Sequence, residues 1–179
     1  MSKSVASKCW FVFALLAGAS AAHAGDAFDG LQCGGDVGKA LAGKHIGNGP
    51  VAAIEKRHAA IGLTHEGSEE LPKSLDYEAW TICGDTYHFI VRKDVVADVV
   101  RADHSKAAPA FLGTCDENGA PTKYEVLAIL KPGNASQGDA RLPATAAWRI
   151  DDSQARFVAM SPEKLMCPRD GIATADGGP

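Results

Sequence analysis

The sequence predicts a fold of the α+β class, built mainly from antiparallel β-strands and stapled by disulfide bonds. Segments 79–91 and 147–158 each place aromatic and β-branched residues around a turn, as β-hairpins do. Helical patterns are few and short, and the cysteines are widely spaced. We therefore expect a sheet sandwich or small barrel of about six strands, with two or three short helices.

The first 24 residues have the three-part pattern of a cleaved signal peptide. Lys3 and Lys8 form a basic start, residues 9–18 are apolar, and small residues precede Ala24. The apolar run is half of the roughly 20 residues that a membrane-spanning helix needs. We expect cleavage after Ala24, which leaves residues 25–179 as a single globular domain that is periplasmic or secreted.

The net charge indicates which kinds of partner the chain can bind. The chain carries 18 Lys and Arg against 22 Asp and Glu, a net charge of −4. Signal cleavage removes two lysines and no acid, so the mature net charge is −6. General nucleic-acid binding needs cations that displace counterions, so we expect no nucleic-acid partner. The mature chain also has no stretch apolar enough for a membrane span, and its acidity favours a cationic protein partner.

Four cysteines remain in the mature chain, and an even count in an exported protein indicates two disulfides. A zinc site would bring cysteines in close pairs, whereas the gaps here are 50, 32 and 52 residues. Three pairings are open, and we weakly prefer the sequential one. It joins Cys33 to Cys83 and Cys115 to Cys167.

The segment before the hairpins combines helical and polar stretches. Asp36 can cap a short helix that Gly43 ends. The apolar residues of segment 51–63 follow neither helical nor strand spacing cleanly, so helix and strand both stay open. Residues 65–73 are polar and acidic and are predicted to form a loop. This loop is our candidate for contacting a protein partner, through His65, Glu66, Glu69 and Glu70.

Two hairpins of similar sequence are expected to contribute a Trp and a Phe each to a shared core. In the first, Gly84 and Asp85 suit the two-residue loop of a type II′ turn. Facing aromatic and β-branched pairs stabilise such ribbons. The predicted facing pairs are Trp80 with Phe89, Ile82 with Tyr87 and Trp148 with Phe157.

Between the hairpins, segments 110–115 and 124–130 are strand candidates, and Asn118-Gly119 predicts a turn between them. The valines of residues 94–101 recur at helical spacing, which predicts a short helix, although β-branched residues make it a mediocre one.

Two polar segments complete the chain. Residues 131–143 are predicted to form a mobile loop, and Ser161-Pro162 to open a single helical turn. A Gly-rich tail, 168–179, follows.

No sequence motif assembles a catalytic, cofactor or metal site. His58 and His65 lack a zinc-binding spacing and fit a solvated surface. Asp94 and Asp98 would lie one helical turn apart, but paired carboxylates catalyse only where their environments separate their pKa values. We therefore name no catalytic, cofactor-binding or metal-binding residue.

Nucleophile and phosphate motifs are equally incomplete. Ser105, His88 and Asp85 supply the residue types of a triad, but a triad is defined by geometry. No Ser has the G-x-S-x-G pattern, and the glycines of residues 34–38 lack a full phosphate-binding motif.

The leading hypothesis is an exported, small, β-rich binding or inhibitor-like protein. It would act through surface loops on a protein partner such as a cationic envelope hydrolase or toxin. One alternative is a small exported hydrolase that uses a histidine or a carboxylate. Another is a structural component of the envelope. The sequence favours binding over catalysis, and no cofactor is expected.

Overall fold

The computed structural model describes residues 26–47, 49–131 and 141–168. The predicted signal peptide and its cleavage site lie outside the described residues. So do positions 132–140 of the predicted mobile loop and 169–179 of the predicted tail.

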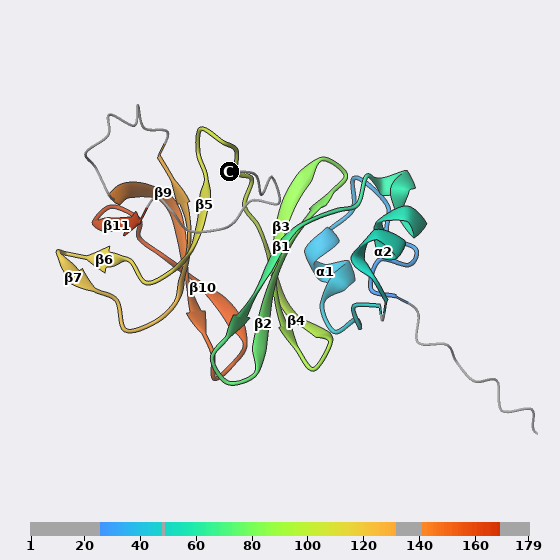
Figure 1. Cartoon of the computed structure of the whole chain (residues 1–179), viewed down its shortest axis with the longest axis horizontal. Coiled ribbons are helices and arrows are strands. Elements are labelled where there is room, and N and C mark those ends of the chain that lie inside the picture. Colours follow the sequence, from blue (N-terminus) through green and yellow to red (C-terminus); the bar gives the residue numbers. More distant parts are fainter. Residues whose placement is uncertain (1–25, 48, 132–140, 169–179) are drawn as a thin grey trace, which may run out of the picture.

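Two short α-helices and one 3₁₀ turn precede the strands and cover one face of the first sheet (Figure 1). The side chain of Asp36 accepts a hydrogen bond from the Lys39 N–H at 3.0 Å, so the predicted cap of the first helix is confirmed. Of residues 51–63, which the sequence leaves open, 51–57 form an α-helix and 59–61 a 3₁₀ turn. The elements are α1 (Val37–Leu41), α2 (Val51–Arg57) and η1 (Ala59–Ile61).

The first sheet is an antiparallel meander in the order β1-β2-β3-β4. Two-residue loops at 83–84 and 93–94 connect its last three strands, and both residues of each loop have positive φ. This is the signature of type I′ turns, whose twist matches the strands that they join. The strands are β1 (Thr64–Leu71), β2 (Leu75–Ile82), β3 (Asp85–Arg92) and β4 (Val95–Arg101).

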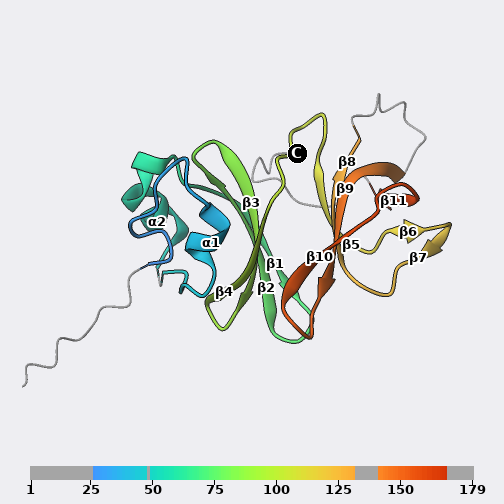
Figure 2. The ribbon, with the colours of Figure 1, turned by 180° about the vertical axis from the view of Figure 1, so that it is seen from behind.

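The second sheet has the order β5-β8-β9-β11-β6-β7, with β10 also paired to β9. Strand β9 has 11 residues and pairs with β8 along one edge and with β10 and then β11 along the other. The sheet curls around this long strand into a half-barrel (Figure 2). Its strands are β5 (Ala110–Gly113), β6 (Asp116–Glu117), β7 (Ala120–Pro121), β8 (Val126–Leu130), β9 (Arg141–Asp151), β10 (Arg156–Met160) and β11 (Leu165–Pro168).

Apolar side chains fill the spaces between these layers. Trp80 and Phe89 belong to the cluster between the helices and the first sheet. Tyr77 and Leu127 belong to the cluster where the two sheets face each other. Leu130 lies in a third cluster, inside the curl of the second sheet. The molecule is thus layered as helices, first sheet and curled second sheet.

The predicted fold class is confirmed, because the structure is mainly antiparallel β with two short α-helices. The sequential disulfide pairing is confirmed too. The S–S distance is 1.97 Å for Cys33–Cys83 and 1.96 Å for Cys115–Cys167.

The prediction of a helix over 94–101 is wrong, because these residues form strand β4. A register shift lies between Val96 and Asp98, so that Ala97 is an extra residue in the ladder. Because of this bulge, Val96 and Val99 both pack on the helix-side cluster although they are three positions apart. A bulged strand has therefore produced a helix-like spacing.

The two Trp–Phe hairpins exist, but both predicted registers are wrong. The first turn is formed by Cys83 and Gly84, which places Trp80 opposite Tyr87. The second hairpin has a four-residue loop, 152–155. Asp151, the last residue of β9, accepts a hydrogen bond from Gln154 N–H within this loop through its side chain. The two hairpins also do not share a core, because Trp80 and Phe89 pack in one cluster and Trp148 and Phe157 in another. In the second hairpin the observed pairs are Phe157 with Ile150 and Ala159 with Trp148.

Three smaller expectations are refined. Strands β5 and β8 pair as predicted, and Asn118-Gly119 forms the turn of a small β6–β7 hairpin between them. Pro162 accepts a turn hydrogen bond from Leu165 N–H at 3.0 Å, but a strand follows instead of a helix. The predicted loop 65–73 is mostly wrong, since residues 64–71 form strand β1 at the edge of the first sheet.

Candidate functional site

A pocket of about 290 Å³ lies between the helix-covered face of the first sheet and the segment leading into α2. Strands β1 and β2 supply one wall, and the β3–β4 turn supplies part of the rim. Among the described residues that line the pocket, none is a Lys or an Arg. The lining residues are Ile46, Gly47, Gly49, Val51, Ile54, His65, Ser68, Asp76, Glu78, Trp80, Val91 and Asp94.

Glu78 is the central acid of this pocket. It lies half-buried on β2, and its Oε2 accepts a hydrogen bond from the Trp80 indole N–H at 2.7 Å. Burial raises the pKa of the Glu78 carboxyl, and the charges of Asp76 and Asp94 raise it further, while the Trp80 bond acts in the opposite direction. A cation placed in the pocket would lower the pKa of Glu78 again, because it favours the ionised carboxylate.

An aromatic pair forms one side of the pocket. The rings of His65 and Trp80 lie 4.5 Å apart, and Trp80 is almost fully buried. Burial lowers the pKa of His65, although Glu55 and Glu66 act in the opposite direction. The lowered pKa favours the neutral imidazole, which brings no positive charge to the acids. The pocket thus combines three carboxyl groups with an uncharged aromatic and aliphatic surface.

The structure places the four predicted contact residues on two faces of β1. His65 lines the pocket, and Glu70 pairs with Asp76, on the pocket side of the sheet. Glu69 pairs with Tyr77, whose side chain faces the second sheet.

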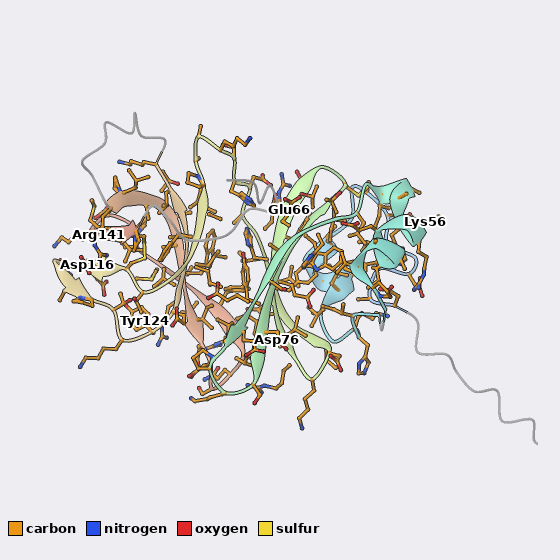
Figure 3. The ribbon with its side chains drawn as sticks, viewed as in Figure 1. Lys56, Glu66, Asp76, Asp116, Tyr124 and Arg141 are labelled. Atoms are coloured by element: carbon orange, nitrogen blue, oxygen red, sulfur yellow. A yellow bond between two sulfur atoms is a disulfide. The ribbon has the colours of Figure 1, made fainter. Side chains whose placement is uncertain are left out.

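Glu66 belongs with Glu69 rather than with the pocket. Its Oε1 accepts a hydrogen bond from the Thr81 hydroxyl at 2.7 Å. Glu66 and Asp76 lie toward opposite ends of the first sheet (Figure 3).

Sequence reasoning missed the three acids of the pocket as a group. Asp76 and Glu78 alternate along β2 on the same side as Trp80, and Asp94 joins them from the next turn. The available signal was Glu78, a carboxylate between the apolar residues Tyr77 and Ala79 of a mostly buried strand, because such positions rarely bury charge.

Two other histidines, His88 and His58, are buried. His88 is fully buried, and its ring nitrogens contact the Tyr77 hydroxyl at 2.5 Å and the Ala102 carbonyl oxygen at 2.9 Å. Neither nitrogen is therefore bonded to Ser105 or Asp85, and the three residues do not form a triad.

His58 is also buried, with its Nε2 3.4 Å from Asp26 Oδ2. Over the described ranges, no group of three or more His, Cys, Asp or Glu side chains could hold a metal ion. No helix in the described part of the chain is long and apolar enough to cross a membrane.

A larger pocket, of about 440 Å³, lies between the ends of the two sheets. Its lining mixes Lys73, Lys123 and Arg149 with three acids, and Lys73 is paired with Asp152 at 2.8 Å. Arg149 lies over the Tyr124 ring, 5.7 Å from its centroid. Because its charges are mixed and partly paired, the lining of this pocket does not favour a ligand of either charge sign.

The fold and the pocket define a disulfide-stapled, two-sheet antiparallel β protein with an acid-lined pocket. Comparisons of the chain with protein-family models, with curated proteins and with solved structures found no match.

Proposed function

We propose that this chain is an exported binding or inhibitor-like protein that holds a cationic side chain of a protein partner in the acid-lined pocket. The observation that carries the proposal is the composition of that pocket. Asp76, Glu78 and Asp94 surround apolar and aromatic groups, and no lining residue that the structure describes carries a permanent positive charge. A lysine or arginine side chain has the matching form, an apolar stem with a charged end.

The overall charge supports the same kind of partner. A mature net charge of −6 attracts a basic protein such as a cationic envelope hydrolase or toxin. The signal-like first 24 residues and the two disulfides are consistent with export to an oxidising compartment.

The test uses a minimal probe, the N-acetyl amide of lysine, followed through the indole N–H resonance of Trp80. We expect a saturable shift with this probe and none with the norleucine analogue, which has the stem but no charge. The affinity should also fall as the pH drops through the raised pKa of Glu78, because the protonated carboxyl no longer attracts the cation.

Matched variants identify the site. The triple change Asp76→Asn, Glu78→Gln, Asp94→Asn should remove the shift, whereas Glu163→Gln, at an exposed position outside the pocket, should leave it intact. Equal shifts for the lysine and norleucine amides would contradict the proposal.

A further inference from the structure

The two outer edges of the first sheet differ in how far other segments of the chain cover them. The outer edge of β4 is covered, because residues 43–46 run along it. Gly43 N–H donates to the Val96 carbonyl at 2.8 Å, and Val96 N–H donates to the Lys44 carbonyl at 2.9 Å. Among the strands that the structure describes, β1 pairs only with β2, so its other side is a free edge within this part of the chain.

Protein groups reach this free edge at one end. The Glu55 carboxylate of α2 accepts the His65 N–H at 2.8 Å. Beyond that point, no backbone hydrogen bond within the described chain joins residues 66–71 to any segment other than β2. Alternate N–H and C=O groups of an edge strand point outward, so this stretch offers unpaired backbone groups to another strand.

The side chains on β1 decide which strand can pair there. The strand contains Glu66, Glu69 and Glu70 and neither Lys nor Arg, and Glu69 and Glu70 are exposed. A second copy of β1 would bring like charges opposite one another, which destabilises strand pairing. An extended basic segment would place opposite charges there instead.

We propose that β1 is a docking edge, to which an extended basic segment of the protein partner adds as a fifth strand of the first sheet. Main-chain hydrogen bonds would supply the pairing, and alternate side chains its selectivity. The inference rests on the proposed function for the cationic nature of the partner, and it adds the mode of recognition.

The pocket lies on the matching face of this edge. Ser68 lines the pocket, and Glu70 pairs with Asp76 on the same side. A basic side chain of the added strand beside Ser68 can therefore enter the pocket, while its sequence neighbours lie over the Glu69 face. The irregularity between His65 and Gly67 leaves residues 67–71 as the regular part of the edge.

The experiment compares two peptides of identical charge. One is the acetylated amide of Lys-Val-Lys-Val-Lys, and the other carries an N-methyl group on the backbone amide of each of its five residues, so that neither edge of the peptide can donate to a strand ladder. We expect the first peptide to slow hydrogen exchange at outward amides of β1. The methylated peptide should bind at least ~10-fold more weakly, since it loses two or more main-chain hydrogen bonds.

A charge control is available within the chain. The double change Glu69→Lys, Glu70→Lys should weaken binding of the unmethylated peptide, whereas Glu163→Lys should not. Equal binding of both peptides would overturn the docking edge. Protection from hydrogen exchange that is confined to amides outside β1 would overturn it too. Self-association of the wild-type chain through β1 in sedimentation would also overturn it.

The outcomes separate this inference from the proposed function. If the lysine amide shifts Trp80 and both peptides bind equally, the pocket stands and the docking edge is wrong. If the lysine amide has no effect and only the unmethylated peptide protects β1, the docking edge stands and the pocket proposal is wrong.

Discussion

His88 shows how one buried residue can set the acid stability of the protein. It lies between the two sheets with an exposed fraction of 0%, and its Nε2 contacts the Ala102 carbonyl oxygen. A carbonyl can only accept, so Nε2 carries the proton and Nδ1 accepts from the Tyr77 hydroxyl. Burial lowers the pKa of His88 to about 4, and the neighbouring His104 lowers it too.

The sign of the pH dependence follows from that lowered pKa. The unfolded chain takes up a proton on this residue near pH 6.5, before the folded chain does. The free energy of unfolding should therefore fall as the pH drops from 6.5 toward 4, by up to about 3 kcal/mol from this residue. Urea unfolding over this range should show a smaller decrease for His88→Gln than for wild type. The exposed His45→Gln should retain the wild-type decrease, and an unchanged slope in His88→Gln would contradict the assignment.

Gly47 is a second position at which a single residue affects stability, because a side chain there would meet a buried carboxylate. A Cβ there would lie 2.5 Å from Oδ2 of Asp26, which is buried and accepts a hydrogen bond from Arg57 at 3.0 Å. We expect Gly47→Ala to lower the free energy of unfolding by about 1–3 kcal/mol, because the carboxylate must shift within its packed surroundings. Gly35→Ala is the control, since its Cβ would lie 3.6 Å from the Gln32 carbonyl oxygen. Equal urea midpoints for the two variants would contradict this steric account.

At the scale of elements, the turns explain which strands the sequence predicts. The loops at 83–84, 93–94 and 118–119 all have two residues with positive φ. Asn118-Gly119 has the residues that such a loop favours, and it is predicted correctly. Lys93-Asp94 carries neither Gly nor Asn, so nothing in the sequence separates β3 from β4. The bulged valine spacing after it then predicts a helix.

The same comparison yields a stability prediction. Replacing Lys93-Asp94 with Asn-Gly should raise the free energy of unfolding by about 1 kcal/mol, because it relieves side-chain strain at positive φ. The reciprocal change of Asn118-Gly119 to Lys-Asp should lower it by a similar amount. Both are measured by urea denaturation, and two changes of the same sign would contradict the turn argument.

The candidate site could be predicted only in part for a related reason. Its segment was recognisable because His65 and the glutamates of β1 form a polar run in the sequence. Glu78 and Asp94 join His65 through strand pairing and a turn, and neither is local in sequence. Assigning the pocket thus required the correct register of β2 and the correct identity of β4, both of which the sequence misassigns.

At the scale of the whole molecule, each disulfide stays within one half of the structure. Cys33–Cys83 joins the segment before α1 to the β2–β3 turn, and Cys115–Cys167 joins β11 to the segment after β5. Neither of these two disulfides crosses between the sheets. Their contact depends on the apolar cluster that both sheets share and on polar links such as Phe157 N–H to Asp98 Oδ2 at 2.7 Å.

This arrangement predicts that the two bridges stabilise different regions. Each closes a loop of about 50 residues, so replacing either pair with serine should cost about 2–5 kcal/mol. Without Cys33–Cys83, amide exchange should accelerate mainly in α1 and its preceding segment, while β8 and β9 stay protected. Without Cys115–Cys167, acceleration should centre on β6, β7 and β11, while β2 and β3 stay protected. Equal acceleration in both halves for each variant would mean that the sheets open together, because the shared cluster then couples them more strongly than the bridges separate them.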